Sequence, residues 1–326
     1  MATLTDSGFP NLANVASRLD PNGTMAKVAD VLSKINPFLE MIPWVEGNSP
    51  DGHQITQSVN SLPSATWRQY NAGVAATKGQ TTQYMESCGR LEDESKIDEA
   101  VLERQGGASY RQSEDALKLE GISQQFATAF FYESTSTNPE RVHGLAPRFP
   151  ATTGYTSSSY VLAGTNGGSN ARSIWLVKFE DRKIYGVFPK GTKAGLEKID
   201  GGRQRVLDSN SRAFWAYITT MVWRCGIAVE DYRNAVRLQW DPDDAEMELA
   251  EKGLYLKMSE AYGTILNPEG AVWLMDRTSR NRFNAQMLAN EGRPLDTMLH
   301  NGRRLEQFNG LPIYLTEALT AETAIT

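Results

Sequence analysis

A stretch of 38 residues, 52–89, carries almost no charge although most of its side chains are polar or small. It holds three charged side chains, Arg68, Lys78 and Glu86, where the whole-chain fraction of 22% would give about eight. Sixteen of its residues are Gln, Asn, Ser or Thr, so it is not an apolar core segment. Interface cores are depleted in charge, and we therefore expect this stretch to face other protein surfaces.

Length and composition indicate an ordinary folded protein. The 326 residues are 40% hydrophobic, which is enough for a sizeable core in two or more lobes. The net charge of −6 argues against a surface that neutralises phosphates, so specific nucleic-acid binding is not expected. Cys88 and Cys225 form no C-x-x-C pair, which excludes a cysteine-rich zinc site. The sequence predicts no secretory signal and no membrane span, and a cytosolic chain is expected.

The polar stretch is predicted to form a long β-hairpin. Gln54–Leu62 and Ala65–Val74 contain Ile, Val, Thr, Trp and Tyr, which favour strands, and Pro63 lies between them. Residues 74–83 are expected to be a flexible return, and charge reappears at about residue 90.

Helices are predicted on both sides of this hairpin. An extended arm over 1–23 is expected to precede a helix over Thr24–Ile35. Residues 91–105 predict a short strand that runs into a helix. The longest helix is predicted over Tyr110–Tyr132, roughly 35 Å long, because apolar residues recur there at helical spacing. Ser109 and Gln112 would form its capping box.

The second half of the sequence is predicted to be rich in strands. Residues 173–240 suggest short antiparallel strands joined by turns. Asp241 is expected to cap a helix whose first position is Pro242. A strand leading into a helix is predicted over 271–288, and a turn followed by a strand over 308–319.

Two short stretches come close to motifs of nucleotide binding or catalysis. Residues 186–193, GVFPKGTK, resemble a phosphate-binding loop, but Thr192 and Lys193 stand in the wrong order, so a strand and a turn are predicted. Residues 167–171, GGSNA, lack the final glycine of a nucleophile elbow. A serine hydrolase acting through Ser169 is therefore kept only as an alternative function.

Other candidate sites are also incomplete. The acidic residues of 241–251 lack the glycine that an EF-hand loop needs at its sixth position, where Glu246 stands. Trp67, Arg68 and Tyr70 could stack on single-stranded nucleic acid, but the lysine- and arginine-rich groove of such a site is missing around them. The sequence thus predicts no catalytic residues, no cofactor and no metal, and a protein that is not an enzyme.

Six stretches spread over the chain point to one protein family. They are KVADVLSKINPFLEMIPWVEGN (27–48), SLPSATWRQYNAGV (61–74), SIWLVKFEDRKIYGVFPKGTKAGL (173–196), WRCGIAVEDYRNAVRL (223–238), VWLMDRTSRNRF (272–283) and FNGLPIYLTEAL (308–319). In content and order they resemble the major capsid protein of tailed bacteriophages with the Hong Kong 97-type fold. The likeness is greatest to coat proteins of short-tailed phages such as the Bordetella one.

This resemblance implies an α+β fold with four parts. They are an N-terminal arm (1–47), an extended loop or E-loop (48–83), a P-domain (84–240) that contains the long spine helix (110–132), and an A-domain (241–326). In the commonest capsid pattern, P-domain strands follow the strand that resembles GLPIYLTEAL. Here that strand ends the sequence, which resembles the rearranged topology of the Bordetella-type coat.

The resemblance also implies a function and partners. The chain would be a structural subunit that self-assembles as pentamers and hexamers into an icosahedral head in the virion, after synthesis in the bacterial cytoplasm. The head would enclose double-stranded DNA without binding it specifically. Scaffolding, decoration and portal proteins are possible further partners, and no membrane is involved.

Four residues of the uncharged stretch are predicted to contact neighbouring subunits. Trp67, Arg68 and Tyr70 are residue types enriched in interface anchors. Lys78 is the one lysine of the hairpin; the sequence shows no group that would activate it for crosslinking, so noncovalent contacts are expected. An encapsulin-like shell of a bacterial compartment is the alternative with the same fold, and it would contain a cargo enzyme detectable by mass spectrometry.

Overall fold

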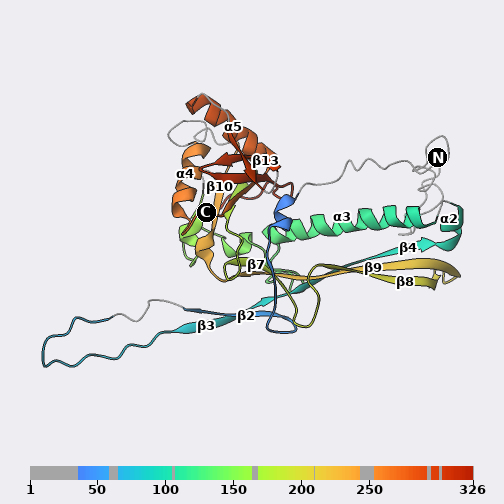
Figure 1. The fold of residues 1–326 in the computed structure, drawn as a ribbon, viewed down its shortest axis with the longest axis horizontal. Helices are drawn as coiled ribbons and strands as arrows, with labels where there is room; N and C mark the ends of the chain where they lie inside the picture. Colours follow the sequence, from blue (N-terminus) through green and yellow to red (C-terminus); the bar gives the residue numbers. More distant parts are fainter. Residues whose placement is uncertain are drawn as a thin grey trace.

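A long helix, a long-stranded ribbon and a projecting hairpin dominate the chain (Figure 1). The computed structural model describes residues 36–58, 65–104, 107–163, 168–208, 210–242, 253–291, 295–300 and 303–325. The predicted arm over 1–23, the helix over Thr24–Ile35 and most of the acidic stretch after Asp241 lie outside these residues.

The ribbon belongs to a five-stranded sheet in which β9 is central. The order is β1–β7–β9–β4, and β8 also pairs with β9. The strands are β1 (Trp44–Glu46), β4 (Gly89–Asp98), β7 (Ile184–Phe188), β8 (Leu196–Leu207) and β9 (Ala213–Val229). β4 and β8 run antiparallel to β9 on its two sides, and β7 pairs with its C-terminal end.

Two features of this ribbon differ from the sequence prediction. β8 and β9 have 12 and 17 residues, so the strands are not all short. β8 also continues through Gly201 and Gly202, although glycine disfavours strands. The structure accommodates these glycines in a β-bulge, where Gly202 takes a φ of 66° that favours glycine.

The helix α3 (Ala108–Tyr132) lies along the ribbon and confirms the predicted long helix (Figure 1). It follows α2 (Glu99–Arg104), which continues directly from β4, as predicted for 91–105. The predicted capping box is wrong: α3 begins at Ala108, so Ser109 lies inside its first turn and caps nothing. Gly107 is the N-cap, and its φ of 54° lets the chain turn from α2 into α3.

The C-terminal half of α3 covers the main hydrophobic core. Phe126, Phe130 and Phe131 are buried and pack among aromatic rings from distant segments. The ring of Phe38, in η1 (Pro37–Glu40), lies 5.1 Å from that of Phe130, and the ring of Trp223 lies 4.4 Å from that of Phe126. Residues 37–44 are anchored to the body by this cluster.

Replacement of Gly186 by alanine is expected to lower the free energy of unfolding by about 1–3 kcal/mol. Gly186 faces Trp44 across the parallel β1–β7 pair, and a Cβ there would lie 2.6 Å from the Trp44 ring. As a control, Gly263→Ala places a Cβ in open space within a helix and should stabilise by about 0.5–1 kcal/mol. Urea unfolding measures the free energy of unfolding of both variants. Equal changes in the two variants would contradict the close packing of Gly186 against Trp44.

A seven-stranded sheet forms the second lobe, in the order β12–β13–β14–β11–β6–β10–β5. Its strands are β5 (Val161–Leu162), β6 (Arg172–Val177), β10 (Ala235–Trp240), β11 (Val272–Met275), β12 (Asp296–His300), β13 (Arg303–Phe308) and β14 (Leu311–Leu315). The helices α4 (Leu254–Thr264) and α5 (Arg277–Glu291) pack on it through a second core cluster. Short 3₁₀ turns complete the described elements: η2 (Ala146–Arg148), η3 (Ser158–Tyr160) and η4 (Tyr232–Asn234).

Several local predictions for this lobe are confirmed. The strand and helix expected over 271–288 are β11 and α5, and the turn and strand expected over 308–319 precede and form β14. Asn309 and Gly310, between β13 and β14, have φ values of 50° and 76°, as a two-residue hairpin turn requires.

The projecting hairpin exists, but its second strand is not the predicted one. β2 (Gly52–Ser58) pairs antiparallel with β3 (Thr81–Ser87), from Gly52 opposite Ser87 to Ser58 opposite Thr81. Residues 65–74 form no strand, and the expected flexible return contains the start of β3. The pairing is set at the root, where Ile55 packs with residues of β7 and β9. Residues 65–74, farther out, pair with no strand among the described residues.

Candidate assembly surfaces

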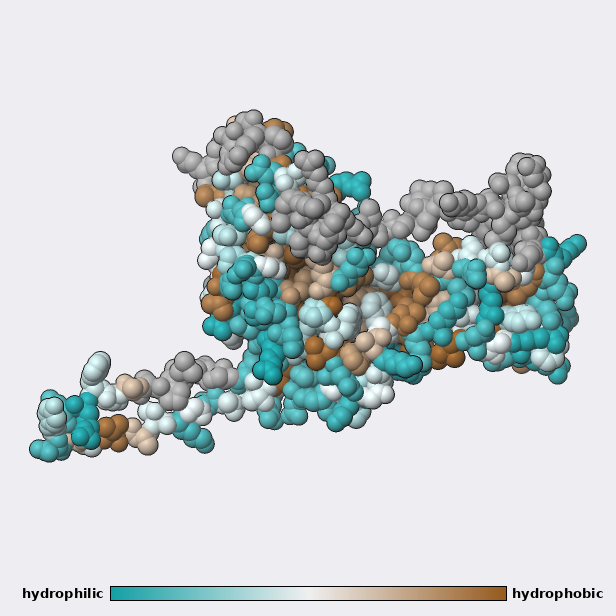
Figure 2. Space-filling view, in the orientation of Figure 1, coloured by the Kyte–Doolittle hydropathy of each residue, from teal (hydrophilic) through white to brown (hydrophobic). Residues whose placement is uncertain are grey.

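The end of the hairpin is an exposed loop over residues 65–80, here called the tip loop. Every residue of the tip loop is exposed, and Trp67 and Tyr70 are 101% and 97% accessible. The four predicted interface residues, Trp67, Arg68, Tyr70 and Lys78, all lie in it. Ala72 N donates to Gln69 O in a turn at Asn71, whose φ is 66°. Figure 2 shows this projection standing clear of the body.

The root of the hairpin is attached to the body by specific hydrogen bonds. Tyr84 donates its hydroxyl to the carbonyl of Val229 over 2.9 Å, and Gln57 donates to the carbonyl of Glu230. The Glu230 carboxylate accepts from the Tyr185 hydroxyl at 2.9 Å. Burial and the nearby carboxylate of Glu86 raise the pKa of Tyr84, so the phenol remains a donor. The hairpin therefore leaves the body at a defined point.

A buried ion pair lies directly below this root. Arg148 Nη2 and Glu86 Oε2 are 2.7 Å apart, and their side chains are 4% and 6% exposed. Arg148 also donates to the carbonyls of His143 and Ile227, both at 3.0 Å. The Ser157 hydroxyl donates to the Arg148 carbonyl at 2.6 Å. This pair ties β3 to the loop after α3 and to β9, so it sets the direction in which the hairpin projects.

The Glu86–Arg148 pair also affects the neighbouring imidazole. Burial, with the positive charge of Arg148 next, lowers the pKa of His143. His143 Nδ1 lies 3.3 Å from the backbone N–H of Thr135, which donates to it, so the neutral ring is held as an acceptor.

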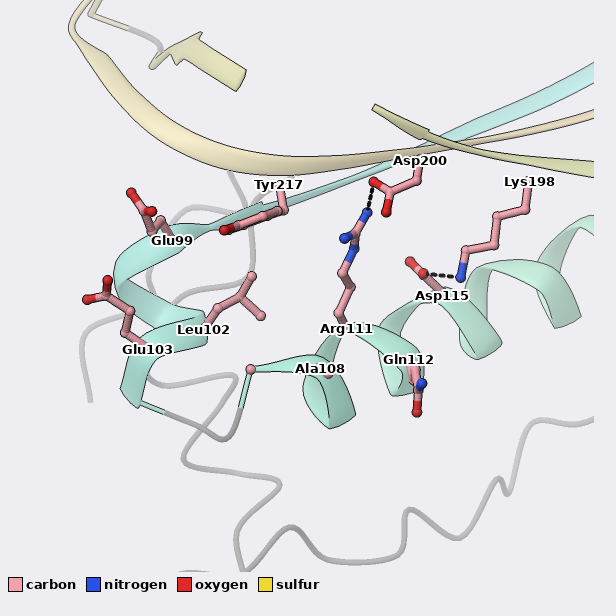
Figure 3. A pocket seen from close by; sticks show the side chains of 11 residues that line it. Glu99, Leu102, Glu103, Ala108, Arg111, Gln112, Asp115, Lys198, Asp200 and Tyr217 are labelled. Carbon is pink, nitrogen blue, oxygen red and sulfur yellow. Dashed lines mark hydrogen bonds and ion pairs between the residues drawn. The ribbon is translucent and has the colours of Figure 1, made fainter. Parts of the chain in front are cut away.

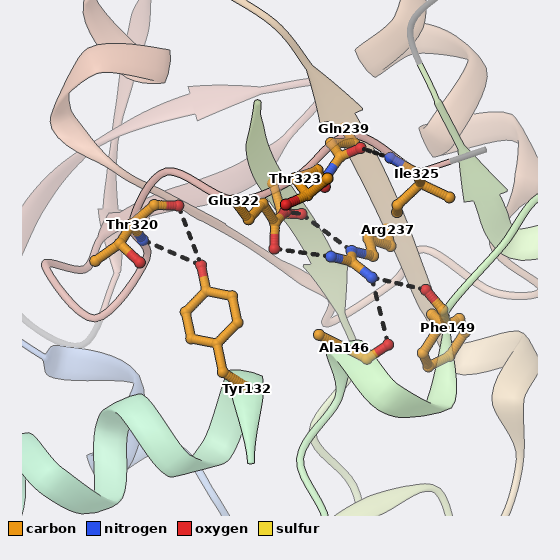
Figure 4. A network of polar contacts seen from close by, with 10 residues as sticks. Tyr132, Ala146, Phe149, Arg237, Gln239, Thr320, Glu322, Thr323 and Ile325 are labelled. Atoms are coloured by element: carbon orange, nitrogen blue, oxygen red, sulfur yellow. Dashed lines mark hydrogen bonds and ion pairs between the residues drawn. The ribbon is translucent and has the colours of Figure 1, made fainter. Parts of the chain in front are cut away.

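A second buried network fastens the C-terminal segment (Figure 4). Arg237 donates to Glu322 Oε2 and to the carbonyl of Phe149, both at 2.8 Å. Gln239 donates to the carbonyl of Thr323 at 3.0 Å. The Tyr132 hydroxyl, at the end of α3, accepts from the N–H of Thr320 at 3.0 Å. The last described residues thus join the spine helix to the seven-stranded sheet.

Sequence reasoning missed these buried charges, although weak signals were present. Glu86 is the one acidic residue in the uncharged stretch 52–89, and Arg237 is the one charge within the apolar strand NAVRLQW. An isolated charge in such a context is expected to have a buried partner. The partners, Arg148 and Glu322, are 62 and 85 residues away, and local patterns do not reveal them.

The turn over 186–193 confirms the strand-and-turn prediction. Phe188 ends β7, and Thr192 N donates to the Pro189 carbonyl. The N–H of Gly191, which a phosphate would need, is bound at 2.8 Å by the carboxylate of Glu46.

The residues of the serine hydrolase alternative lie in separate elements. Ser169 lies in a bend before β6, whereas His53, His143 and His300 lie in β2, in the loop after α3 and in β12. The described residues contain no group of three His, Cys, Asp or Glu that could hold a metal ion. None of the described helices is long and apolar enough to cross a membrane.

The arrangement of spine helix, long ribbon, projecting hairpin and sheet lobe is the Hong Kong 97-type capsid fold, as expected, and it defines a class of shell-forming proteins. The sequence matches the family model described as major capsid protein GP7 over residues 20–326, so the chain belongs to this family. It is a structural family, not a class of enzymes, and it favours a phage capsid over an encapsulin-like compartment.

Solved phage capsids are similar to the chain. The capsid protein of bacteriophage epsilon15 shares 27% identity at a TM-score of 0.77, with all of both chains covered. The capsid protein of bacteriophage JBD30 shares 9% identity at a TM-score of 0.51, over 95% of this chain and 99% of that one. No curated protein matches. The chain is therefore a major capsid protein of a phage virion, and its partners in the shell are other copies of itself.

Proposed function

We propose that the tip loop is the main contact through which this capsid subunit holds its neighbours in pentamers and hexamers. The observation that carries the proposal is the complete exposure of Trp67 and Tyr70 on a loop with no carboxylate. Burying a large apolar side chain gains about 1.5–3 kcal/mol, and this gain is unused in the isolated subunit. A second copy that covers both rings would recover it.

The body supplies the rigid part of this mechanism. The ribbon, α3 and the two core clusters form one continuous framework, and the hairpin is attached to it by Tyr84, Gln57 and the Glu86–Arg148 pair. A shell needs one chain to make contacts that differ between pentamers and hexamers. A loop that makes few contacts with its own body can adjust to both, while the framework keeps its shape.

We assign the domains as the resemblance implies, with one extension. Residues 1–47 are the arm, 48–83 the E-loop, 84–240 the P-domain and 241–326 the A-domain. The seven-stranded sheet combines β5, β6 and β10 with β11–β14, so strands from both sides of residue 240 share one layer. We therefore propose that β5, β6 and β10 belong in space to the A-domain lobe.

We also propose that the shell encloses double-stranded DNA without binding it specifically. The net charge of −6 favours an interior that does not hold phosphates tightly. Scaffolding, decoration and portal proteins would act as further partners of the assembled head.

The double substitution Trp67→Ala/Tyr70→Ala is expected to raise the protein concentration needed for shell assembly at least tenfold. Removing two exposed rings takes away interface anchors but no contact within the subunit, so its melting temperature should stay unchanged. Light scattering and electron microscopy measure how many shells form at each protein concentration. Tyr155→Ala, which removes an exposed ring from the body, is the matched control. Normal assembly of the double variant would refute the role of the tip loop.

A further inference from the structure

A polar pocket of about 420 Å³ lies beside the root of the projecting hairpin. Its walls come from β3, from the loop after α3, from η2, from the turn before η3 and from η4. The buried pair of Glu86 and Arg148 lines this pocket together with His143. The pocket, here called the root pocket, therefore places a titratable imidazole beside the ion pair that ties the hairpin to the body.

The backbone at His143 is held close to the end of α3. Gly144 N donates to the carbonyl of Glu133 at 2.8 Å, and a Cβ at position 144 would lie 2.7 Å from the carbonyl oxygen of Ala129. The carbonyl of His143 itself accepts from Arg148 at 3.0 Å. The backbone has little room to move, so a change in the charge of the imidazole acts on the ring and on the groups beside it.

Two charged side chains of the root pocket act on the imidazole. The positive charge of Arg148, on η2, disfavours a charged ring, and the negative charge of Glu86, on β3, favours it with a smaller effect. The other titratable side chains that line the pocket are those of Tyr84, Tyr155 and Tyr232. On the segment of His143 itself, Glu133 and Arg141 are paired with each other. The imidazole therefore lies between the two members of the buried pair in its electrostatic interactions.

The neutral form of His143 fits its hydrogen bonds. Its Nδ1 accepts from the backbone N–H of Thr135 at 3.3 Å and lies 3.2 Å from the Thr135 hydroxyl. A protonated imidazole is a donor at both nitrogens, so it can no longer accept from that N–H. It is also a second cation, and it competes with Arg148 for the single carboxylate of Glu86.

We propose that His143 is a pH-sensitive switch of the hairpin root: protonation of its imidazole loosens the contact between Glu86 and Arg148 and lets β3 separate from η2. The root pocket provides space in which the charged ring can turn toward water. An open root lets the hairpin leave the body in other directions. The switch concerns the attachment of the hairpin to its own body, so it does not depend on the role of the tip loop.

The direction of the pH effect follows from the pKa of His143. Burial, with the charge of Arg148 next, holds that pKa below the ordinary value of 6.5 in the closed root, and solvation of the ring in an open root removes both causes. The open root therefore binds the proton more tightly. Acidification below about pH 6.5 favours opening, whereas the closed root keeps its full stability above this value.

Amide hydrogen exchange of the unassembled full chain, measured by mass spectrometry, tests the switch. Rates are compared between about pH 7.5 and about pH 5.5, above the range in which carboxylic acids ordinarily titrate, and corrected for the intrinsic pH dependence of exchange. The protection of amides in β3 is expected to fall about threefold or more on acidification. Other segments serve as references.

Two substitutions assign this fall to one ring. His143→Gln keeps an oxygen that can accept from Thr135 N–H but cannot become charged, and it should abolish the fall. His53→Gln is the matched control, because it removes the histidine of β2 on the same hairpin, and it should leave the fall unchanged.

The pocket of about 490 Å³ at the start of α3 supplies the internal reference (Figure 3). There Lys198 Nζ lies 2.7 Å from Asp115 Oδ2, and Arg111 is hydrogen-bonded to Asp200. The residues that line this pocket include ion pairs but no histidine. Amides of β8 should therefore keep their protection over the same pH range. An equal fall in β3 and β8 would mean that the whole fold opens, which overturns a local switch.

Deuterium exchange at the ring carbon between the two nitrogens measures the pKa of each histidine without any substitution. His143 should titrate below 6.5 in the folded chain. A pKa at or above 6.5, constant protection of β3 in the parent, or the same fall in His143→Gln overturns the proposal. If His143→Gln does not fold, the ring measurement and the protection of β3 in the parent decide.

Discussion

A variant in which an Asn-Gly turn replaces residues 59–80 is expected to fold normally and to form no shells. Ser58 and Thr81 face each other in the β2–β3 register, so a two-residue turn can join them. The packing of Ile55 and the hydrogen bond of Tyr84 stay in place. We expect the melting temperature to change by only a few degrees, because every described residue that is removed, 65–80, is exposed.

Light scattering and electron microscopy of the purified variant measure assembly, with an expected loss of at least a hundredfold in particle yield. A second variant replaces the same 22 residues by a Gly/Ser linker of equal length. It should also fail to assemble, since the contact requires the side chains of the tip loop and not the length of the chain. Unfolding of the shortened variant would mean that the loop belongs to the subunit core, and normal shells would mean that other surfaces carry assembly.

Replacement of Arg148 by alanine is expected to lower the free energy of unfolding by about 3–5 kcal/mol. The substitution leaves the Glu86 carboxylate buried without its partner and removes the hydrogen bonds to the carbonyls of His143 and Ile227. Removing one member of a buried pair is costly because the other charge keeps its desolvation penalty. The hairpin root should loosen in the same variant.

Urea unfolding followed by circular dichroism measures this change. The double variant Glu86→Leu/Arg148→Met removes both charges and should recover most of the lost stability. Arg90→Ala is the matched control, because Arg90 and Glu92 form an exposed pair, 56% and 41% accessible, expected to contribute at most about 1 kcal/mol. A cost of Arg148→Ala similar to that of Arg90→Ala would show that the buried pair does not hold the hairpin root.

The parts of the fold that the sequence predicted are those defined by local patterns. The helical spacing of Ile122, Phe126 and Phe130 identified α3, although not its first residue. The pair Asn309-Gly310 marked the turn before β14. In the same way, the scarcity of charge in residues 52–89 predicted a segment that faces other protein surfaces, and the structure places Trp67 and Tyr70 on an exposed loop of that segment.

The parts that were missed depend on partners distant in the sequence. Residues 65–74 have strand-favouring side chains, yet β3 pairs with β2 because the root packing of Ile55 sets the register. The predicted capping box at Ser109 was wrong because the chain turns at Gly107, two residues before Ser109. Strand and helix propensities describe a residue and its near neighbours in the sequence. Strand pairing and turn position also depend on contacts with residues far away in the sequence.

The sequence by itself determined the family of the chain, its long helix and the low charge of its projecting hairpin. These properties lie in contiguous residues, where composition and periodicity are enough to identify them. Only the tertiary structure decided which charges are buried together and which surround a pocket. Glu86 in β3 meets Arg148 in the loop after α3, and Asp115 in α3 meets Lys198 in β8, because the fold places these elements, distant in the sequence, side by side.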